Sequence, residues 1–423
     1  MGARTKWVRR CVWLMGLAST GLFASSLAHQ HHPNGLLESV MNSIEEMRKP
    51  NSILPQNFLT TQSLITHQGF GYQKYKVQTE DGYILTAHRI LSDNPGGPPV
   101  ILQHGLIAAS DNLVVQGRNA CIAFLLADAG FDVWLTDQRG NWYSREHVKY
   151  KPSDPKFWDF SFHEAGYYDL PAFIDTVLQI TGYTQVFYIG HSMGTTVFMV
   201  MASLRPEYNQ KIKAAALLAP IALPPKMQEI NSPVIRLLLL QAGLIYATSN
   251  KFGLHELLPR TAQNIMAIRK LCDPSPTQEF CLDLIGIVYG ENRENLDRQV
   301  FGTKVSYLPA GSSLRTAHHL AQIYTHGFRH YDYGAKDNLR RYRSEQPPHY
   351  PLTNITAPVA LYWGANDLLL NGRTVRELGQ SLPNLIKSFE VADPKFTHMD
   401  FIFGLNAAEV LYKDIVYLFQ SLL

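Results

Sequence analysis

Short, continuously apolar runs recur along this chain, separated by longer stretches in which apolar residues follow a helical spacing. The apolar runs lie at 99–103, 131–136, 186–189, 214–218, 359–363 and 385–391. The helical stretches between and after them lie at 120–129, 166–181, 195–204 and 407–422. Strands that are apolar on both faces are typical of a parallel sheet covered by helices on each side. The pattern therefore predicts an α/β fold with a mostly parallel central sheet.

A different pattern precedes the first of these strands. Residues 72–78 and 83–90 alternate apolar and polar side chains, and the pair Asp81-Gly82 between them favours a tight turn. We therefore expect a β-hairpin ahead of the parallel strands. In the helix predicted at 166–181, Pro171 is expected in the first turn, where its missing N–H costs little.

The strand–helix rhythm stops between residues 220 and 348. This stretch is largely helical in composition, and it begins with three prolines, Pro220, Pro224 and Pro225. We interpret 220–348 as a helical cap inserted into an α/β core, whose two parts are 69–219 and 349–423. Residues 237–247 are its most apolar run, but they are too few to cross a bilayer.

The N-terminal residues have the pattern of a secretory signal. A basic start precedes an apolar stretch at 12–23, and small residues follow at Ser26 and Ala28. We expect residues 1–28 to form a signal peptide, cleaved after Ala28. The alternative is a membrane anchor, for which the apolar stretch is short. Residues 29–68 are then an N-terminal segment, either a pro-segment or a wrap around the core.

Charge and cysteine content narrow the function classes. With 38 Lys and Arg against 35 Asp and Glu, the net charge of +3 gives no case for nucleic-acid binding. Neither a metal-ligand spacing nor a phosphate-binding Gly loop is present, so we expect no metal and no cofactor.

Cys272 and Cys281 close a small loop, and a disulfide between them suits a secreted protein. Cys121, in an apolar helical run, is expected to be a buried and inert thiol. A glycosylation sequon begins at Asn354, ahead of a predicted strand.

The first chemical motif is Gly-His-Ser-Met-Gly at 190–194. It follows the strand at 186–189 and opens a helix, so its glycines permit a sharp turn that exposes the Ser192 hydroxyl. The N–H of Met193 then lies at a helix N-terminus, where it can stabilise an oxyanion. The motif predicts a nucleophilic serine; the alternative is an ordinary Gly-rich turn.

A second motif, His104-Gly105-Leu106, directly follows the strand at 99–103. In a fold of this kind the loop after that strand supplies a second oxyanion donor from the backbone, and we assign it to the Leu106 N–H. The alternative is a plain connecting loop without a role in catalysis.

A serine nucleophile needs a base and a group that orients the base. Asp367 and His398 follow the two last predicted strands, in the chain order Ser, acid, His that the nucleophile-turn motif requires. The competing acids are Asp393 and Asp400; Asp400 is expected to cap the final helical region instead. The competing bases lie beside Ser192 or in the cap, and we expect none of them to act: His191, His318, His319, His326 and His330.

Taken together, these segments resemble the animal acid lipases, which include gastric and lysosomal acid lipases and insect relatives. The resemblance extends from about residue 51 to the end and is carried by 79–83, 104–106, 137–141, 168–172, 190–196, 331–334, 366–367 and 398–401. It implies an α/β-hydrolase core with a helical cap and lid, and the Cys272–Cys281 spacing is similar to that of the family's disulfide. Met193 departs from the family, which usually has Gln after the nucleophile.

The resemblance also implies a substrate and a location. We expect Ser192, Asp367 and His398 to hydrolyse triacylglycerols or sterol esters through an acyl-enzyme, without a cofactor. The binding partner is then a neutral lipid at an oil–water or membrane surface, and we expect the protein to act as a monomer. We expect it to enter the secretory pathway and to be extracellular or lysosomal. Two alternatives stay open: an esterase for short or soluble acyl esters, and a non-catalytic lipid-binding relative of the same fold.

Overall fold

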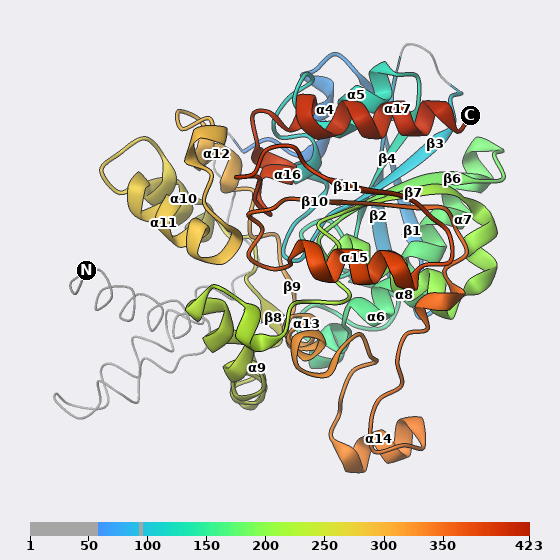
Figure 1. Ribbon diagram of the computed structural model, residues 1–423, viewed down its shortest axis with the longest axis vertical. Coiled ribbons are helices and arrows are strands. Elements are labelled where there is room, and N and C mark those ends of the chain that lie inside the picture. Colours follow the sequence, from blue (N-terminus) through green and yellow to red (C-terminus); the bar gives the residue numbers. More distant parts are fainter. Residues whose placement is uncertain (1–57, 93–95) are drawn as a thin grey trace.

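The computed structural model describes residues 58–92 and 96–423 (Figure 1). The predicted signal peptide and most of the predicted N-terminal segment lie outside these residues. The last part of that segment forms helix α4 (Thr61–Thr66), whose N-cap is Thr60 and whose Ile65 is fully buried in the core. This part of the N-terminal segment therefore packs as an element of the fold.

In the part of the chain that the structure describes, the centre of the molecule is a mixed sheet of nine strands. Its strands are β1 (Gly71–Gln78), β2 (Tyr83–Leu91), β3 (Pro99–Gln103), β4 (Asp132–Asp137), β5 (Glu146–His147), β6 (Val186–His191), β7 (Ile212–Leu218), β10 (Val359–Trp363) and β11 (Leu385–Glu390). Their order is β1-β2-β4-β3-β6-β7-β10-β11, with β5 paired to β2. Strands from β4 to β11 run parallel, whereas β1, β2 and β5 are antiparallel to their neighbours. The predicted hairpin and parallel sheet are both confirmed.

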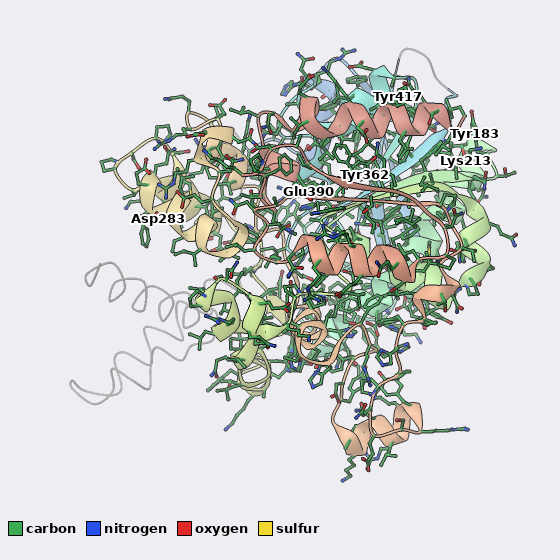
Figure 2. All side chains as sticks on the ribbon, viewed as in Figure 1. Tyr183, Lys213, Asp283, Tyr362, Glu390 and Tyr417 are labelled. Carbon is green, nitrogen blue, oxygen red and sulfur yellow. A yellow bond between two sulfur atoms is a disulfide. The ribbon has the colours of Figure 1, made fainter. Side chains whose placement is uncertain are left out.

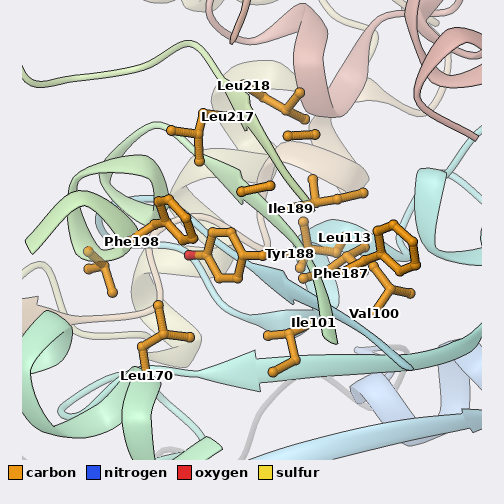
Figure 3. Packing of buried hydrophobic residues seen from close by; sticks show 14 of the residues in the cluster. Val100, Ile101, Leu113, Leu170, Phe187, Tyr188, Ile189, Phe198, Leu217 and Leu218 are labelled. Atoms are coloured by element: carbon orange, nitrogen blue, oxygen red, sulfur yellow. The ribbon is translucent and has the colours of Figure 1, made fainter. Parts of the chain in front are cut away.

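Helices cover both faces of this sheet (Figure 1). They are α5 (Ile122–Asp128), α6 (Phe162–Glu164), α7 (Leu170–Thr181), α8 (Met193–Leu204), α15 (Gly372–Ser381), α16 (Asp400–Phe403) and α17 (Lys413–Ser421). Successive side chains of a strand point to opposite faces. Phe187 accordingly packs on Phe419 of α17, at 4.5 Å between ring centroids. Tyr188 stacks on Phe198 of α8, at 5.0 Å (Figure 3).

The helix predicted at 166–181 begins earlier than expected. A capping box formed by Ser161 and Glu164 starts α6, and a π-helical turn at 165–169 joins α6 to α7 without a break. Pro171 therefore lies in the first turn of α7, as predicted, although the π-helical turn continues the helix ahead of it. It cannot donate to the Tyr167 carbonyl, which instead accepts a hydrogen bond from Arg205 Nη1 at 3.3 Å.

The segment between β7 and β10 holds a separate group of helices. They are α9 (Pro233–Lys251), α10 (Ala262–Cys272), α11 (Gln278–Tyr289), α12 (Phe301–Val305), α13 (Leu314–His326) and α14 (Ala335–Tyr342), with a small ribbon of β8 (Glu256–Leu257) and β9 (Ser312–Ser313). In Figure 1, α10, α11 and α12 form a group to the left of the sheet, and α14 projects at the bottom. Figure 2 shows Asp283 of α11 and Lys213 of β7 on opposite sides of the molecule.

Candidate active site

Ser192 occupies the turn between β6 and α8. Its backbone has φ 54° and ψ −120°, a strained conformation for a residue with a side chain. The turn is fixed by the Ser192 N–H, which donates to Leu218 O at 2.9 Å. It also requires Gly194, because a Cβ there would lie 2.6 Å from Gln103 O. The glycines of the motif thus allow the turn, as expected, and Ser192 bears its strain.

The structure brings Ser192, His398 and Asp367 into one hydrogen-bonded chain. Ser192 Oγ lies 2.8 Å from His398 Nε2, and His398 Nδ1 lies 2.7 Å from Asp367 Oδ2. The Asp367 carboxylate can only accept, so Nδ1 carries the proton. The lone pair of Nε2 then faces the serine hydroxyl, which donates to it. This arrangement suits proton transfer from Ser192 to His398.

The competing carboxylates have other partners. Asp400 lies in the first turn of α16, and its Oδ2 accepts from the N–H and the hydroxyl of Thr397, at 2.7 and 2.9 Å. Burial raises the pKa of Asp400 to about 6. Asp393 accepts from the N–H of Lys395 at 2.9 Å. Both carboxylates therefore order the loop that carries His398. The carboxylate that hydrogen-bonds to the His398 ring is that of Asp367.

The competing histidines also lie elsewhere. His191 points its Nε2 at the backbone carbonyl of His398, 3.2 Å away, and burial holds its pKa well below the usual range, so it donates as a neutral ring. His319 of α13 is fully buried between Ser161 Oγ and Arg329 O, at 2.9 and 3.0 Å. These contacts give His191 and His319 a structural role in the packing of the protein.

The two predicted oxyanion donors flank the serine. Gly105 packs closely on it, since a Cβ at Gly105 would lie 3.1 Å from Ser192 Cβ. Leu106 follows Gly105 directly, and Met193 opens α8 with its side chain buried. Within the described ranges, neither the Leu106 nor the Met193 N–H donates to a protein acceptor. Both N–H groups are therefore available to a ligand.

His104 holds the Leu106 peptide, a role that sequence reasoning missed. Its Nδ1 lies 2.8 Å from Gly105 O, while its Nε2 accepts from the Gln138 N–H at 3.2 Å and from Asn141 Nδ2 at 3.0 Å. Two donors at Nε2 place the proton on Nδ1, and burial lowers the His104 pKa, which favours this neutral ring. Because Gly105 O and Leu106 N belong to one peptide unit, fixing the carbonyl also fixes the N–H.

Four other predicted residues take no part in the hydrogen-bonded chain of Ser192, His398 and Asp367. Cys272 and Cys281 form a disulfide between α10 and α11. Cys121 is a free, buried thiol, and burial raises its pKa to about 12, which keeps it protonated. Asn354 is exposed before β10, and its Nδ2 donates to Ser203 O at 3.0 Å. Glycosylation of Asn354 stays a prediction, and it would have to replace that hydrogen bond.

Within 58–92 and 96–423, no three His, Cys, Asp or Glu side chains are grouped so that they could hold a metal ion. None of the helices in those ranges is long and apolar enough to cross a membrane. The Leu-rich run at 237–247 belongs to α9.

Comparison with known proteins places this arrangement in a family. Residues 98–270 match the α/β-hydrolase fold, and residues 61–117 match the partial α/β-hydrolase lipase region. Lipase 1 of Drosophila melanogaster is 37% identical over 371 residues, which cover 87% of this chain and 81% of the fly protein. Gastric triacylglycerol lipase of Homo sapiens is 35% identical over 370 residues, 86% of this chain and 91% of that protein. The chain belongs to this family of lipases.

Solved structures confirm the lipase's fold. A crystal structure from Sulfolobus solfataricus matches with a TM-score of 0.55 at 14% sequence identity, over 83% of this chain and 94% of that one. At so low an identity the match concerns the α/β-hydrolase fold alone. The predicted fold class and the resemblance to the acid lipases are both confirmed by these comparisons.

Proposed function

We propose that this lipase hydrolyses the carboxylic ester bonds of neutral lipids, triacylglycerols or sterol esters, through an acyl-enzyme on Ser192. The observation that carries the proposal is the chain of hydrogen bonds from Ser192 Oγ through His398 to Asp367, at 2.8 and 2.7 Å. A serine in a strained turn at a helix N-terminus, with a base and an orienting acid in reach, is the arrangement that nucleophilic acyl transfer needs.

The reaction follows from the position of the protons. His398 Nε2 takes the Ser192 proton as Oγ forms a bond to the ester carbonyl carbon. The carbonyl oxygen becomes an oxyanion, held by the N–H groups of Leu106 and Met193. Collapse breaks the ester C–O bond, and the leaving alcohol takes the proton from His398. Water then repeats these steps on the acyl-enzyme and releases the fatty acid. Asp367 keeps Nδ1 protonated throughout.

The apolar surface of α9 supports a lipid rather than a soluble ester as substrate. Leu237, Leu238, Leu240 and Leu244 are 43%, 39%, 66% and 61% exposed, and α9 contains no acidic residue. Exposed apolar groups on an amphipathic helix are typical of proteins that dock on lipid surfaces. We assign the helical segment 220–348 as the cap, with this face of α9 toward the lipid. The disulfide and the predicted signal peptide favour a site of action in the secretory pathway or outside the cell.

The test compares Ser192→Ala with Ser203→Ala. Ser203 is a buried serine of α8, the helix that follows Ser192, and its hydroxyl donates to Val200 O at 3.0 Å. On emulsified triacylglycerol, Ser192→Ala should lose at least about 10⁴-fold in kcat, while Ser203→Ala stays near the wild type. Retained turnover in Ser192→Ala would contradict the proposal.

Two further measurements separate the alternatives. A fluorophosphonate should label the wild type at Ser192, and absence of labelling would favour a non-catalytic lipid-binding protein. Rates on dispersed and emulsified esters of increasing chain length should rise at the emulsion. A maximum on short, dispersed esters would instead identify a soluble-ester esterase.

A further inference from the structure

Tyr289, the last residue of α11, contacts the proposed base directly. Its ring lies nearly parallel to the His398 imidazole, with centroids 5.7 Å apart and planes inclined by 17°. The backbone carbonyl of Tyr289 accepts a hydrogen bond from the backbone N–H of His398 at 3.3 Å. Burial, and then the Asp367 charge, raise the pKa of the Tyr289 phenol. The helical segment therefore places a neutral ring and a backbone acceptor on His398.

Gly290, the next residue, lies against both loops of the acid–base pair. A Cβ there would lie 2.0 Å from Asn366 O and 3.0 Å from Thr397 Cγ2. Asn366 and Thr397 are the residues immediately before Asp367 and His398. The φ of +101° at Gly290 is also one that residues with side chains rarely adopt. Only glycine allows the chain to pass this close to both loops.

Two side-chain amides then connect the same stretch to the loops. Asn366 Nδ2 donates to Glu291 O at 2.9 Å. Asn292 Nδ2 donates at 3.1 Å to Asp400 Oδ2, the oxygen that also accepts from Thr397. The Asn366 side chain thus fixes the loop that carries Asp367. The Asn292 side chain supports the Asp400 carboxylate, which orders the loop that carries His398.

We infer that residues 289–292, here called the brace, position Asp367 and His398 for catalysis. The two loops are joined to each other by the Asn366 N–H, which donates to Phe396 O at 3.1 Å. The brace fixes this pair from the side of the helical segment, so the acid–base geometry is completed by 220–348 and not by the α/β core alone. The inference rests on the proposed function, in which Asp367 and His398 act on Ser192.

Gly290→Ala tests the brace, with Gly327→Ala as its matched control. Gly327 has φ +81° but no atom within 4 Å of an added Cβ, so it carries the backbone strain without the close approach. On a soluble short-chain ester, Gly290→Ala should lower kcat about 10- to 100-fold with little change in KM, because small misplacements of reacting groups have effects of this size. Gly327→Ala should keep the wild-type kcat.

A second readout does not depend on turnover. The Nδ1–H of His398, hydrogen-bonded to Asp367, should give a low-field proton signal in the NMR spectrum of the wild type and of Ser192→Ala. Gly290→Ala should weaken or abolish that signal, and Asn292→Ala, which leaves the backbone unstrained, should weaken it and lower kcat several-fold.

The outcomes separate the brace from the function. Folded Gly290→Ala with the wild-type kcat and low-field signal would overturn the brace. If Gly290→Ala does not fold, the same result in Asn292→Ala would overturn it. Turnover retained by Ser192→Ala would overturn the proposed function instead, and the low-field signal would still report whether the brace holds the Asp367–His398 contact.

Discussion

Helices α8 and α9 are both rich in apolar residues, yet they lie in opposite environments. Every residue of α8 from Met193 to Ser203 is buried, because the helix lies between the sheet and the helices α6 and α7. In α9 only Val234, Ile235 and Ser249 are buried, and several leucines are exposed. Apolar composition therefore predicts a helix in both cases, but burial depends on what packs against it.

The difference in burial between α8 and α9 corresponds to two different roles of the regions that contain them. The sheet and α8 fix the strained turn at Ser192 in a tightly packed environment. The segment 220–348 exposes an apolar helix face and, through residues 289–292, contacts the loops of Asp367 and His398.

Truncation within the α8 core should destabilise the protein most. Phe198 is fully buried and stacks on Tyr188. Phe198→Ala removes that contact and leaves a cavity, so the free energy of unfolding should fall by about 3–5 kcal/mol. Urea titration followed by far-UV circular dichroism measures the change. A loss below about 1 kcal/mol would show that α8 is less constrained than its burial indicates.

Most of the core was predictable from the sequence, because its signals are local. Continuous apolar strands, the Asp81-Gly82 turn and the Gly-x-Ser-x-Gly turn each determine a short stretch of backbone. The position of Asp367 and His398 after the last predicted strands, together with the chain order Ser, acid, His, selected the residues that the structure brings together. The start of α6 was missed, although the capping-box pair Ser161 and Glu164 is a local signal for it.

Contacts between distant segments could not be predicted in the same way. Arg139 is buried with its Nε 2.8 Å from Asp169 Oδ1 and its Nη1 2.6 Å from Asp81 Oδ2. Each of these residues lies in a segment that carries the family resemblance, but nothing local pairs them. The brace at 289–292 and the hydrogen bond from His104 to Gly105 O are of this kind. They depend on tertiary packing, which has no periodic signature in the sequence.

The disulfide should matter less than the core, and its effect should be local. Cys272 and Cys281 join α10 to α11 across a sequence separation of 9 residues. In the chain-entropy model, a loop of this length stabilises the folded state by about 2–3 kcal/mol. Replacing both cysteines by serine should therefore increase hydrogen exchange within α10 and α11, measured by mass spectrometry, and leave α8 unchanged. Equal deprotection of α8 would show that the two regions unfold together.

Acid should weaken the contact between α9 and α13 through His318. Its ring stacks on Tyr246 of α9, its Nδ1 lies 2.7 Å from Tyr331 Oη, and burial lowers its pKa to about 4. Asp332 opposes this lowering, whereas Arg315 and His326 add to it. Between pH 6.5 and about 4 the unfolded chain binds more protons at this site. The stability present above pH 6.5 is therefore lost as the pH falls.

His318→Gln should remove this pH dependence in part. The partly exposed position limits the effect, so we expect the decline in unfolding free energy from pH 6.5 to 4 to shrink by about 1–2 kcal/mol. Urea titrations at several pH values measure it. His67→Gln, at the exposed C-cap position of α4, is the control. An identical decline in His318→Gln and the wild type would mean that His318 does not contribute.

The smallest effect on stability, and the sharpest test of the comparison, is expected on the exposed face of α9. Leu240→Ser with Leu244→Ser removes two largely exposed side chains, so the free energy of unfolding should change by less than about 0.5 kcal/mol. If this face docks on lipid, sedimentation with a triacylglycerol emulsion should show roughly tenfold weaker adsorption, because each leucine would bury apolar area there. Turnover of a soluble short-chain ester should not change. Gln241→Ser, an exposed polar position of α9, controls for surface substitution. Wild-type adsorption of the double variant would show that α9 differs from α8 in packing only, and that another surface meets the lipid.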